Sequence, residues 1–290
     1  MSFAARAAPP FESTPGATPG PSAAVRVGII NIMPRAETYE AYLARPLAAA
    51  PVPVEPVWMR LESHTYSSSD IARVGGYVTH GQLAQQAPLD ALILTGAPVE
   101  ELAFEDVRYI DELRAILEGA RQRRVPTLGL CWGGLALGHL LGLPKILFDR
   151  KLFGVYQQTA LAAQHPLLEG LGERFLCVHS RHSGIPNEAL ERARDAGAVE
   201  LLAGSGETGY SLFTSRDGLF VAHLGHPEYP ATRLREEWER DTALGRPDIE
   251  PPRNYDTRDP QATWAPDSDR FFANWIGAIA NNRSAAVNET

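Results

Sequence analysis

The sequence is poor in several features that would assign it to particular classes of protein. Only two of its 290 residues are cysteines, Cys131 and Cys177. Two are too few for a disulfide framework, and their spacing does not suit a zinc site. No apolar run approaches the roughly 18 residues that cross a bilayer, and the N-terminus lacks the basic and then apolar order of a signal peptide. We therefore expect a cytoplasmic protein with no membrane segment and no metal site.

An excess of positive charge is also missing. The chain has 35 acidic and 27 basic residues, which gives a net charge of -8. This charge argues against general nucleic-acid binding, so we expect neither nucleic acid nor a membrane as a partner. The composition is 44% hydrophobic and 21% charged. These proportions are normal for a globular protein that buries a sizeable core.

The chain divides into a short tail and one long domain. Residues 1–24 are rich in Ala, Pro, Ser, Thr and Gly, and their few apolar residues have no period. Such a segment buries too little surface to offset the entropy of ordering, so we predict a flexible tail. Residues 25–285 show neither a linker nor an internal repeat, and we predict a single domain there.

Strand and helix patterns alternate in the first half of this domain. Continuous aliphatic runs predict buried strands at 25–32, 52–58 and 91–94. Helical patterns predict one helix that ends at Ala48 and a second that covers residues 109–122. The alternation predicts an α/β fold with a doubly wound, mostly parallel sheet. In such sheets ligands bind beyond the carboxyl ends of the strands.

Shorter elements follow Leu143. We predict that these strands extend the sheet or form a hairpin beside the cleft. They cover residues 152–156, 175–178, 199–203, 210–214 and 219–224. A helix is predicted over 229–244, and a buried stripe from Phe271 to Ile279 predicts another. Between them, residues 246–266 form a long irregular connection, a length typical of a lid or a subunit contact.

The stretch from Val125 to Leu141 contains the strongest chemical signal. A short apolar run leads into Gly129-x-Cys131-x-Gly133, and a buried helix follows. This pattern is the cysteine form of a nucleophile elbow, in which glycines are needed because a β-carbon would clash. The N-terminus of the next helix favours a thiolate and presents amides to an oxyanion. The alternative is that Cys131 is a small apolar core residue.

A base for this cysteine is predicted at His226. Pro227 disfavours helical geometry at His226, so residues 226 and 228 present their side chains on one side. Glu228 would then hold one ring nitrogen while the other faces Cys131. Alternatively, the pair caps the following helix. Three other histidines also lie near strand ends: His179, His182 and His223.

Six segments between Val25 and Ile279 together support a more specific assignment. They are Asn31–Pro34, Leu94–Pro98, Cys131–Trp132, Lys151–Tyr156, His179–Arg181 and Gly225–Tyr229. With these in order, the chain resembles the homoserine O-acyltransferase family, whose flavodoxin-like fold is similar to that of class I glutamine amidotransferases. The resemblance implies a ping-pong transfer in which Cys131 attacks acetyl-CoA, His226 acts as base and acid, and Glu228 orients His226. It also implies a homodimer that uses acetyl-CoA as co-substrate and no other cofactor.

The resemblance also implies roles in substrate binding. Lys151 and Arg240 would grip the homoserine carboxylate and amine, with Ser180 beside the acceptor side chain. Glu100 falls where the family has glutamate with acetyl-CoA and glycine with succinyl-CoA, because a carboxylate repels the free end of a succinyl group. Candidate oxyanion or donor contacts are Arg35 and Trp132. The open alternatives are surface ion pairs for the cations, serine as acceptor, succinyl as donor, a hydrolase or amidotransferase, and a non-catalytic binding module.

Overall fold

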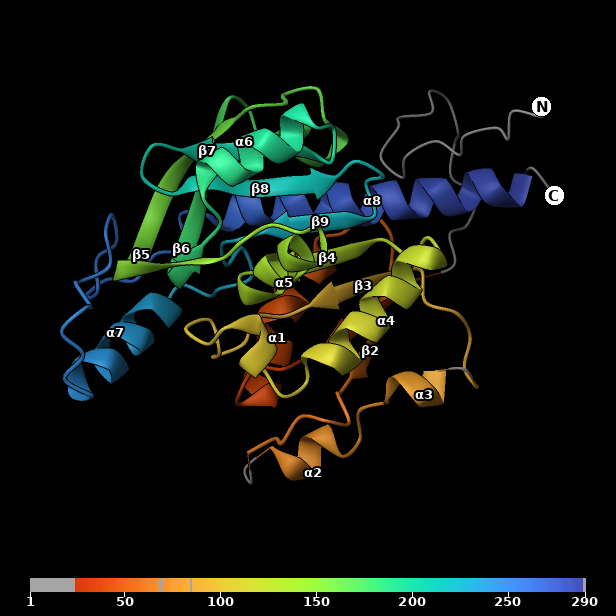
Figure 1. Cartoon of the computed structure of the whole chain (residues 1–290), viewed down its shortest axis with the longest axis horizontal. Helices are drawn as coiled ribbons and strands as arrows, with labels where there is room; N and C mark the ends of the chain where they lie inside the picture. The colour runs from red at the N-terminus through yellow and green to blue at the C-terminus, as the bar shows by residue number, and fades with distance from the viewer. Residues whose placement is uncertain (1–23, 68–69, 84, 289–290) are drawn as a thin grey trace.

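The computed structural model describes residues 24–67, 70–83 and 85–288. Its central element is a nine-stranded sheet (Figure 1). The predicted tail lies outside these ranges except for Ala24. The strands are β1 (Val25–Ile30), β2 (Val54–Met59), β3 (Ala91–Leu94), β4 (Thr127–Leu130), β5 (Ile146–Ala160), β6 (Arg174–Gly184), β7 (Val199–Ser205), β8 (Gly209–Ser215) and β9 (Phe220–His223). The helices are α1 (Ala36–Ala48), α2 (Ile71–Val74), α3 (His80–Leu83), α4 (Ile110–Gln122), α5 (Trp132–Leu140), α6 (Asn187–Asp195), α7 (Arg233–Ala243) and α8 (Ala265–Asn288).

The sheet has a parallel half and an antiparallel half. Its order is β2-β1-β3-β4-β9-β8-β7-β5-β6, and the pairs from β2 to β9 are parallel. The remaining pairs are antiparallel, so the late strands extend the sheet. The predicted α/β fold is confirmed. Among the helices of the described residues, none is long and apolar enough to cross a membrane.

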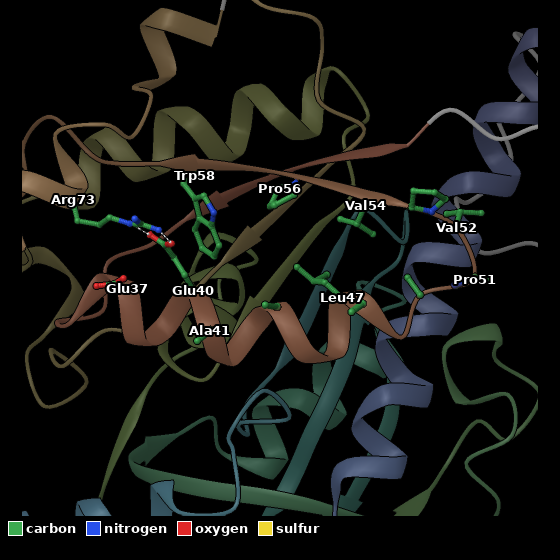
Figure 2. A pocket seen from close by; sticks show the side chains of 14 residues that line it. Glu37, Glu40, Ala41, Leu47, Pro51, Val52, Val54, Pro56, Trp58 and Arg73 are labelled. Carbon is green, nitrogen blue, oxygen red and sulfur yellow. Dashed lines mark hydrogen bonds and ion pairs between the residues drawn. The ribbon is translucent and has the colours of Figure 1, made fainter.

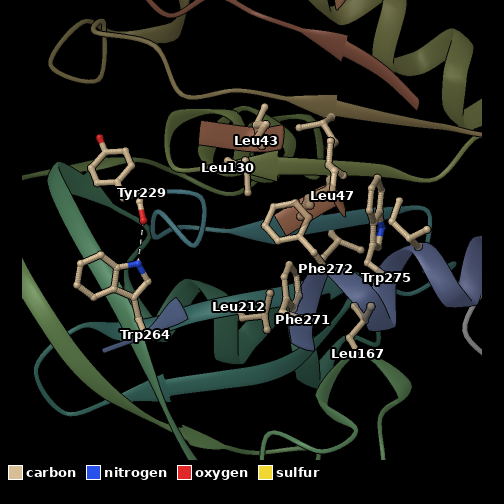
Figure 3. Packing of buried hydrophobic residues seen from close by; sticks show 14 of the residues in the cluster. Leu43, Leu47, Leu130, Leu167, Leu212, Tyr229, Trp264, Phe271, Phe272 and Trp275 are labelled. Atoms are coloured by element: carbon tan, nitrogen blue, oxygen red, sulfur yellow. Dashed lines mark hydrogen bonds between the residues drawn. The ribbon is translucent and has the colours of Figure 1, made fainter. Parts of the chain in front are cut away.

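Helices cover both faces of the parallel half. Val27 and Ile29 of β1 face a core that includes Leu43 of α1 and Trp275 of α8 (Figure 3). Ile30, the next residue, faces the opposite core with side chains of α4 and α5. Successive side chains of a strand point to opposite faces, so a continuous aliphatic run suits a strand that is covered on both sides.

The structure corrects the predicted helix at 229–244, which begins only at Arg233. Pro230 disfavours helical geometry at Tyr229, the residue before it. Residues 226–229 instead form a turn, in which the Tyr229 amide donates a hydrogen bond to the His226 carbonyl at 3.3 Å. The Tyr229 side chain therefore turns back toward His226. Helix α6 was not predicted, because only Ala189 and Leu190 are buried on it and they make too short a stripe.

The irregular connection before α8 packs along β5. The Val155 amide donates to the Arg253 carbonyl at 2.9 Å, and the Arg253 amide donates to the Phe153 carbonyl at 3.0 Å. Gly154 has φ +139°, and a β-carbon there would lie 2.4 Å from the Arg253 backbone nitrogen. A glycine is thus required where the two backbones meet, and the middle of the connection is fixed against β5.

Candidate active site

The predicted elbow is present between β4 and α5. Cys131 is the single residue between these elements and has φ 49° and ψ -113°, a region that non-glycine residues rarely adopt. Two hydrogen bonds hold this backbone. The Cys131 amide donates to the His223 carbonyl at 2.8 Å, and the Leu135 amide donates to the Cys131 carbonyl at 3.1 Å. The side chain thus stands at the N-terminus of α5, at the positive end of the helix dipole.

Gly129 is required by the close approach of the elbow to its own helix. A β-carbon at this position would lie 2.4 Å from the Gly133 carbonyl oxygen. We expect Gly129→Ala to cost about 2–3 kcal/mol and to lower the melting temperature by about 5–10 °C. Gly206→Ala is the matched control, because a β-carbon there meets nothing within 4 Å. Equal melting temperatures for the two variants, measured by calorimetry, would contradict the predicted clash.

The structure brings Cys131, His226 and Glu228 together. His226 Nδ1 lies 2.7 Å from Glu228 Oε1, and the same ring forms a hydrogen bond with the Cys131 side chain. Both His226 and Cys131 also border Gly96, where a β-carbon would lie 3.5 Å from His226 Cε1 and 3.7 Å from Cys131 Cβ. All three residues are buried, and Cys131 is the most exposed at 5%. This is the arrangement that a nucleophile, a base and an orienting carboxylate need.

The electrostatic environment favours a protonated imidazole. Burial alone would lower the pKa of His226, but the charges of Cys131 and Glu228 and the hydrogen bonds to both raise it well above its usual value. The Tyr39 hydroxyl also donates to Glu228 Oε1. Two donors therefore converge on one carboxylate oxygen, which keeps a proton on His226 Nδ1 and leaves Nε2 to exchange one with the thiol.

A second cluster lies around two carboxylates of α7. Glu237 accepts hydrogen bonds from the Ser180 and Tyr229 hydroxyls and pairs with Lys151 at 3.3 Å. Burial would raise the pKa of Glu237, but Lys151 and Arg233 lower it to about 2. Asp241, one turn further along α7, lies 2.8 Å from the Lys151 ammonium.

Arg240 joins this cluster from the surface. Its guanidinium lies 2.6 Å from Asp241 Oδ1, and its side chain is 50% exposed. Lys151 reaches the other oxygen of the same carboxylate. Two cations thus meet at the one carboxylate of Asp241. The three predicted acceptor residues, Lys151, Ser180 and Arg240, are therefore gathered along α7.

Glu100 faces the same group of charges from the loop after β3. Its Oε2 accepts a hydrogen bond from the His182 amide at 2.9 Å. Burial raises the pKa of the Glu100 carboxyl, whereas the His182 amide and the positive charges of Lys151 and His226 oppose this rise. The Glu100 carboxyl group is therefore anchored on β6 by a hydrogen bond, and it interacts electrostatically with both Lys151 and His226.

Two cavities differ in their relation to these residues. One of about 400 Å³ lies beside Lys151 and is lined by Phe148, Arg150, Leu152, Tyr156, Glu207, Glu250 and Arg253. A larger cavity of about 780 Å³ lies between α1 and β2 (Figure 2). An ion pair between Glu40 and Arg73 stands at its rim, and none of the predicted site residues lines it. Of these two cavities, the smaller one provides open space next to Lys151, a predicted substrate contact.

Comparisons with known proteins give the family of this chain. The model of the family described as "HTS: Homoserine O-succinyltransferase" matches residues 16–285 of the chain. The chain belongs to this family. A homoserine O-acetyltransferase from Bacteroides fragilis is 34% identical over 258 residues, which are 87% of this chain and 83% of the relative. A homoserine O-acetyltransferase from Geobacillus kaustophilus is 36% identical over 254 residues, covering 86% and 83% of the two chains.

Solved structures support the fold of this family member. A glutamine amidotransferase from Thermotoga maritima superposes with a TM-score of 0.54 at 14% identity, covering 90% of this chain and 98% of that one. A putative GMP synthase subunit from Thermoplasma acidophilum gives 0.54 at 15% identity, with 91% and 98% covered. The predicted similarity to the glutamine amidotransferase fold is confirmed.

The structure does not bring the side chains of the two candidate oxyanion contacts to the thiol. Arg35 is exposed and adopts φ 60° at the start of α1, where its amide donates to Asp70. The Trp132 side chain is fully buried against Phe104 and Tyr109, because the first turn of α5 directs it into the core. Only the Trp132 backbone amide, at the first position of α5, remains as a candidate donor.

Four residues of these clusters were not predicted: Tyr39, Tyr229, Glu237 and Asp241. A signal exists for the two carboxylates. Residues 233, 237 and 241 are spaced by four positions, so they share one face of a helix, and Arg240 lies three positions after Glu237. Tyr229 belongs to the Gly225–Tyr229 segment but was assigned to a helix. Tyr39 has no local signal, since it meets Glu228 from 189 residues away.

Proposed function

We propose that this family member transfers an acetyl group from acetyl-CoA through Cys131 to the hydroxyl of L-homoserine. The observation that carries the proposal is the continuous set of contacts from Cys131 and His226, through Tyr229 and Glu237, to Lys151 and Ser180. The proposed nucleophile and its base thus lie beside a charged cluster that would hold an amino acid. Homoserine acyl transfer is the chemistry named for the family and for the relatives above.

The first half-reaction forms a thioester on the protein. The Cys131 sulfur attacks the carbonyl carbon of acetyl-CoA, and the resulting oxyanion faces the Trp132 amide at the start of α5. One such donor is typically worth about 3 kcal/mol in the transition state. The bond from carbon to the CoA sulfur then breaks, and CoA leaves with the proton of His226 Nε2. Exchange of one thioester for another is nearly isoenergetic, so little driving force is needed.

The second half-reaction passes the acetyl group to oxygen. His226 Nε2 takes the proton of the homoserine hydroxyl while that oxygen attacks the Cys131 thioester. The carbon–sulfur bond breaks, Cys131 recovers the proton, and an O-acetyl ester is released. Lys151 and Arg240 would hold the acceptor carboxylate. Both now pair with Asp241, and they would either give up these ion pairs or keep them while they bind the acceptor.

The presence or absence of the acceptor tests the proposal. The purified protein is mixed with acetyl-CoA, with and without L-homoserine, and the free CoA thiol is followed over time. We expect a burst of one CoA per chain without the acceptor and continuous release with it. Equal continuous release in both mixtures would identify a hydrolase instead. Repeating the assay with L-serine and with succinyl-CoA ranks the alternative acceptor and donor.

Glu100 is proposed to select the acetyl donor. Its anchored carboxylate would meet the free carboxylate of a succinyl group, and such like-charge contacts cost several kcal/mol when desolvated. We expect Glu100→Gly to raise the ratio of kcat/KM for succinyl-CoA to that for acetyl-CoA by at least about tenfold. Glu101→Gly is the matched control, because Glu101 is half exposed and pairs with Arg246. If the two variants change the ratio equally, Glu100 does not select the donor.

A further inference from the structure

Tyr229 contacts both the imidazole and the cluster around Glu237 and Asp241 of α7. Its ring is stacked on His226, with centroids 4.0 Å apart and planes inclined by 20°. Its hydroxyl lies 3.3 Å from His226 Nε2 and donates to Glu237 Oε1 at 2.9 Å. The residue is 2% exposed, and its carbonyl accepts a hydrogen bond from the Trp264 indole at 3.1 Å (Figure 3). Tyr229 is thus held at both its backbone and its hydroxyl.

This geometry decides how Tyr229 acts on the imidazole. Because the two rings are nearly parallel, the hydroxyl oxygen lies above the plane of the His226 ring rather than in it. The in-plane direction from Nε2 therefore stays open for Cys131. Since the hydroxyl proton is donated to Glu237, the oxygen presents its lone pairs to the ring. An electron-rich oxygen and an aromatic face stabilise a cation more than a neutral ring.

We propose that Tyr229 is a positioning residue for acyl transfer, which fixes the plane of the His226 ring and favours its protonated form. The inference rests on the proposed function. The positively charged imidazole is the acid that protonates the departing CoA sulfur, so its stabilisation matters most in the first half-reaction. Glu237 contributes by anchoring the hydroxyl, which links the position of the base to the cluster that holds Ser180 and Lys151.

Other titratable groups also surround His226. They are Cys131 before α5, Glu228, Glu100 after β3, His179 on β6, His223 on β9 and Glu237 on α7. Tyr39 reaches Glu228 and Arg233 of α7 reaches Tyr229, so both act on His226 through a neighbour. Burial lowers the pKa of His179 well below its usual value and that of His223 to about 4, so both are neutral near pH 7. The Arg233 guanidinium lies over Tyr229, 5.6 Å from the ring centroid, and opposes a second cation nearby.

The test measures the first half-reaction alone. Wild type, Tyr229→Phe and Tyr229→Leu are each mixed rapidly with acetyl-CoA, and the burst of CoA thiol is recorded as a function of pH. The rate falls at alkaline pH where His226 loses its proton. In Tyr229→Phe, which keeps the stack but loses the oxygen, we expect this fall to move to lower pH by about one unit, with a plateau rate about tenfold lower. Tyr229→Leu should lose about a hundredfold, because the ring is no longer clamped.

Tyr42→Phe is the matched control. Tyr42 packs edge-on against the Tyr229 ring at 6.2 Å, but its hydroxyl points to Glu236 at 3.5 Å. We expect its pH profile to equal that of wild type. If the pH profile of Tyr229→Phe also equals that of wild type, or if the profiles of Tyr229→Phe and Tyr42→Phe shift equally, the inference is overturned.

Two further measurements keep the inference independent of folding and of the reaction. If Tyr229→Phe does not fold, Glu237→Gln must move the alkaline fall in the same direction, because it weakens the pull on the hydroxyl proton. An unchanged profile would overturn the inference. Proton NMR titration of the His226 ring, assigned with His226→Asn, needs no substrate. A wild type that is inactive toward acetyl-CoA rejects the proposed function, while an equal titration in Tyr229→Phe and wild type rejects the role of Tyr229.

Discussion

Replacing Cys131 with alanine is expected to lower the rate of acyl transfer by about 10⁴-fold or more. The proposed reaction passes through a thioester, and no other described side chain at the elbow offers a nucleophile to the same imidazole. The φ of 49° is held by hydrogen bonds of the backbone, so alanine leaves the elbow in place. Intact-protein mass spectrometry after mixing with acetyl-CoA should find one added acetyl group on wild type and none on the variant.

Cys177→Ala is the control for this result. Cys177 is the other cysteine, 3% exposed, and burial raises the pKa of its thiol far above the usual range, so it is inert. This variant should retain the acetyl group and the transfer activity. If the acetyl adduct persists in Cys131→Ala or disappears in Cys177→Ala, the assignment of the thioester to Cys131 is wrong.

The parts of the site that follow from local sequence were predictable. The elbow depends on residues 129–134, in which Gly129 is required by a backbone a few positions away and Gly133 by the backbone of Leu94 in the adjacent strand β3. The bond from His226 to Glu228 spans only two residues and is therefore local, although it forms within the turn at 226–229 rather than along the extended segment that the sequence predicts. The parallel strands were equally visible, because burial on both faces leaves a continuous aliphatic run.

The parts that depend on packing between distant segments were not predictable. Tyr39 meets Glu228 because α1 packs on the sheet in one particular rotation, and no spacing in the sequence encodes that rotation. Glu237 meets Ser180 only because α7 lies beside the end of β6, 57 residues away. Each of these contacts gives a role to a residue that alone reads as an ordinary surface glutamate or core tyrosine.

Helix phase and backbone conformation explain the two candidates that were placed elsewhere. Trp132 follows the nucleophile directly, but a helix turns about 100° per residue, so its side chain enters the core while Cys131 faces the site. Arg35 precedes α1 in a left-handed conformation and is exposed to solvent. A motif match places a residue in the chain but does not orient its side chain.

Glu228→Gln is expected to slow the first half-reaction by about a thousandfold. Glu228 is fully buried, and its Oε1 accepts from both His226 Nδ1 and Tyr39. A glutamine amide can turn its N–H toward Nδ1, which stabilises the tautomer with the proton on Nε2 and removes the base that Cys131 needs. The lost charge also lowers the pKa of the imidazole, so the alkaline fall in rate should move to lower pH. Stopped-flow release of CoA measures both effects.

Tyr39→Phe separates the charge of Glu228 from the geometry around it. It removes the second donor to Oε1 while the carboxylate and its bond to His226 remain. With the charge retained, the tautomer is still fixed, and we expect a loss of less than about tenfold. If Tyr39→Phe is as slow as Glu228→Gln, the alignment of the carboxylate governs the rate. The charge would then not be what stabilises the imidazolium, and the assigned role of Glu228 would be wrong.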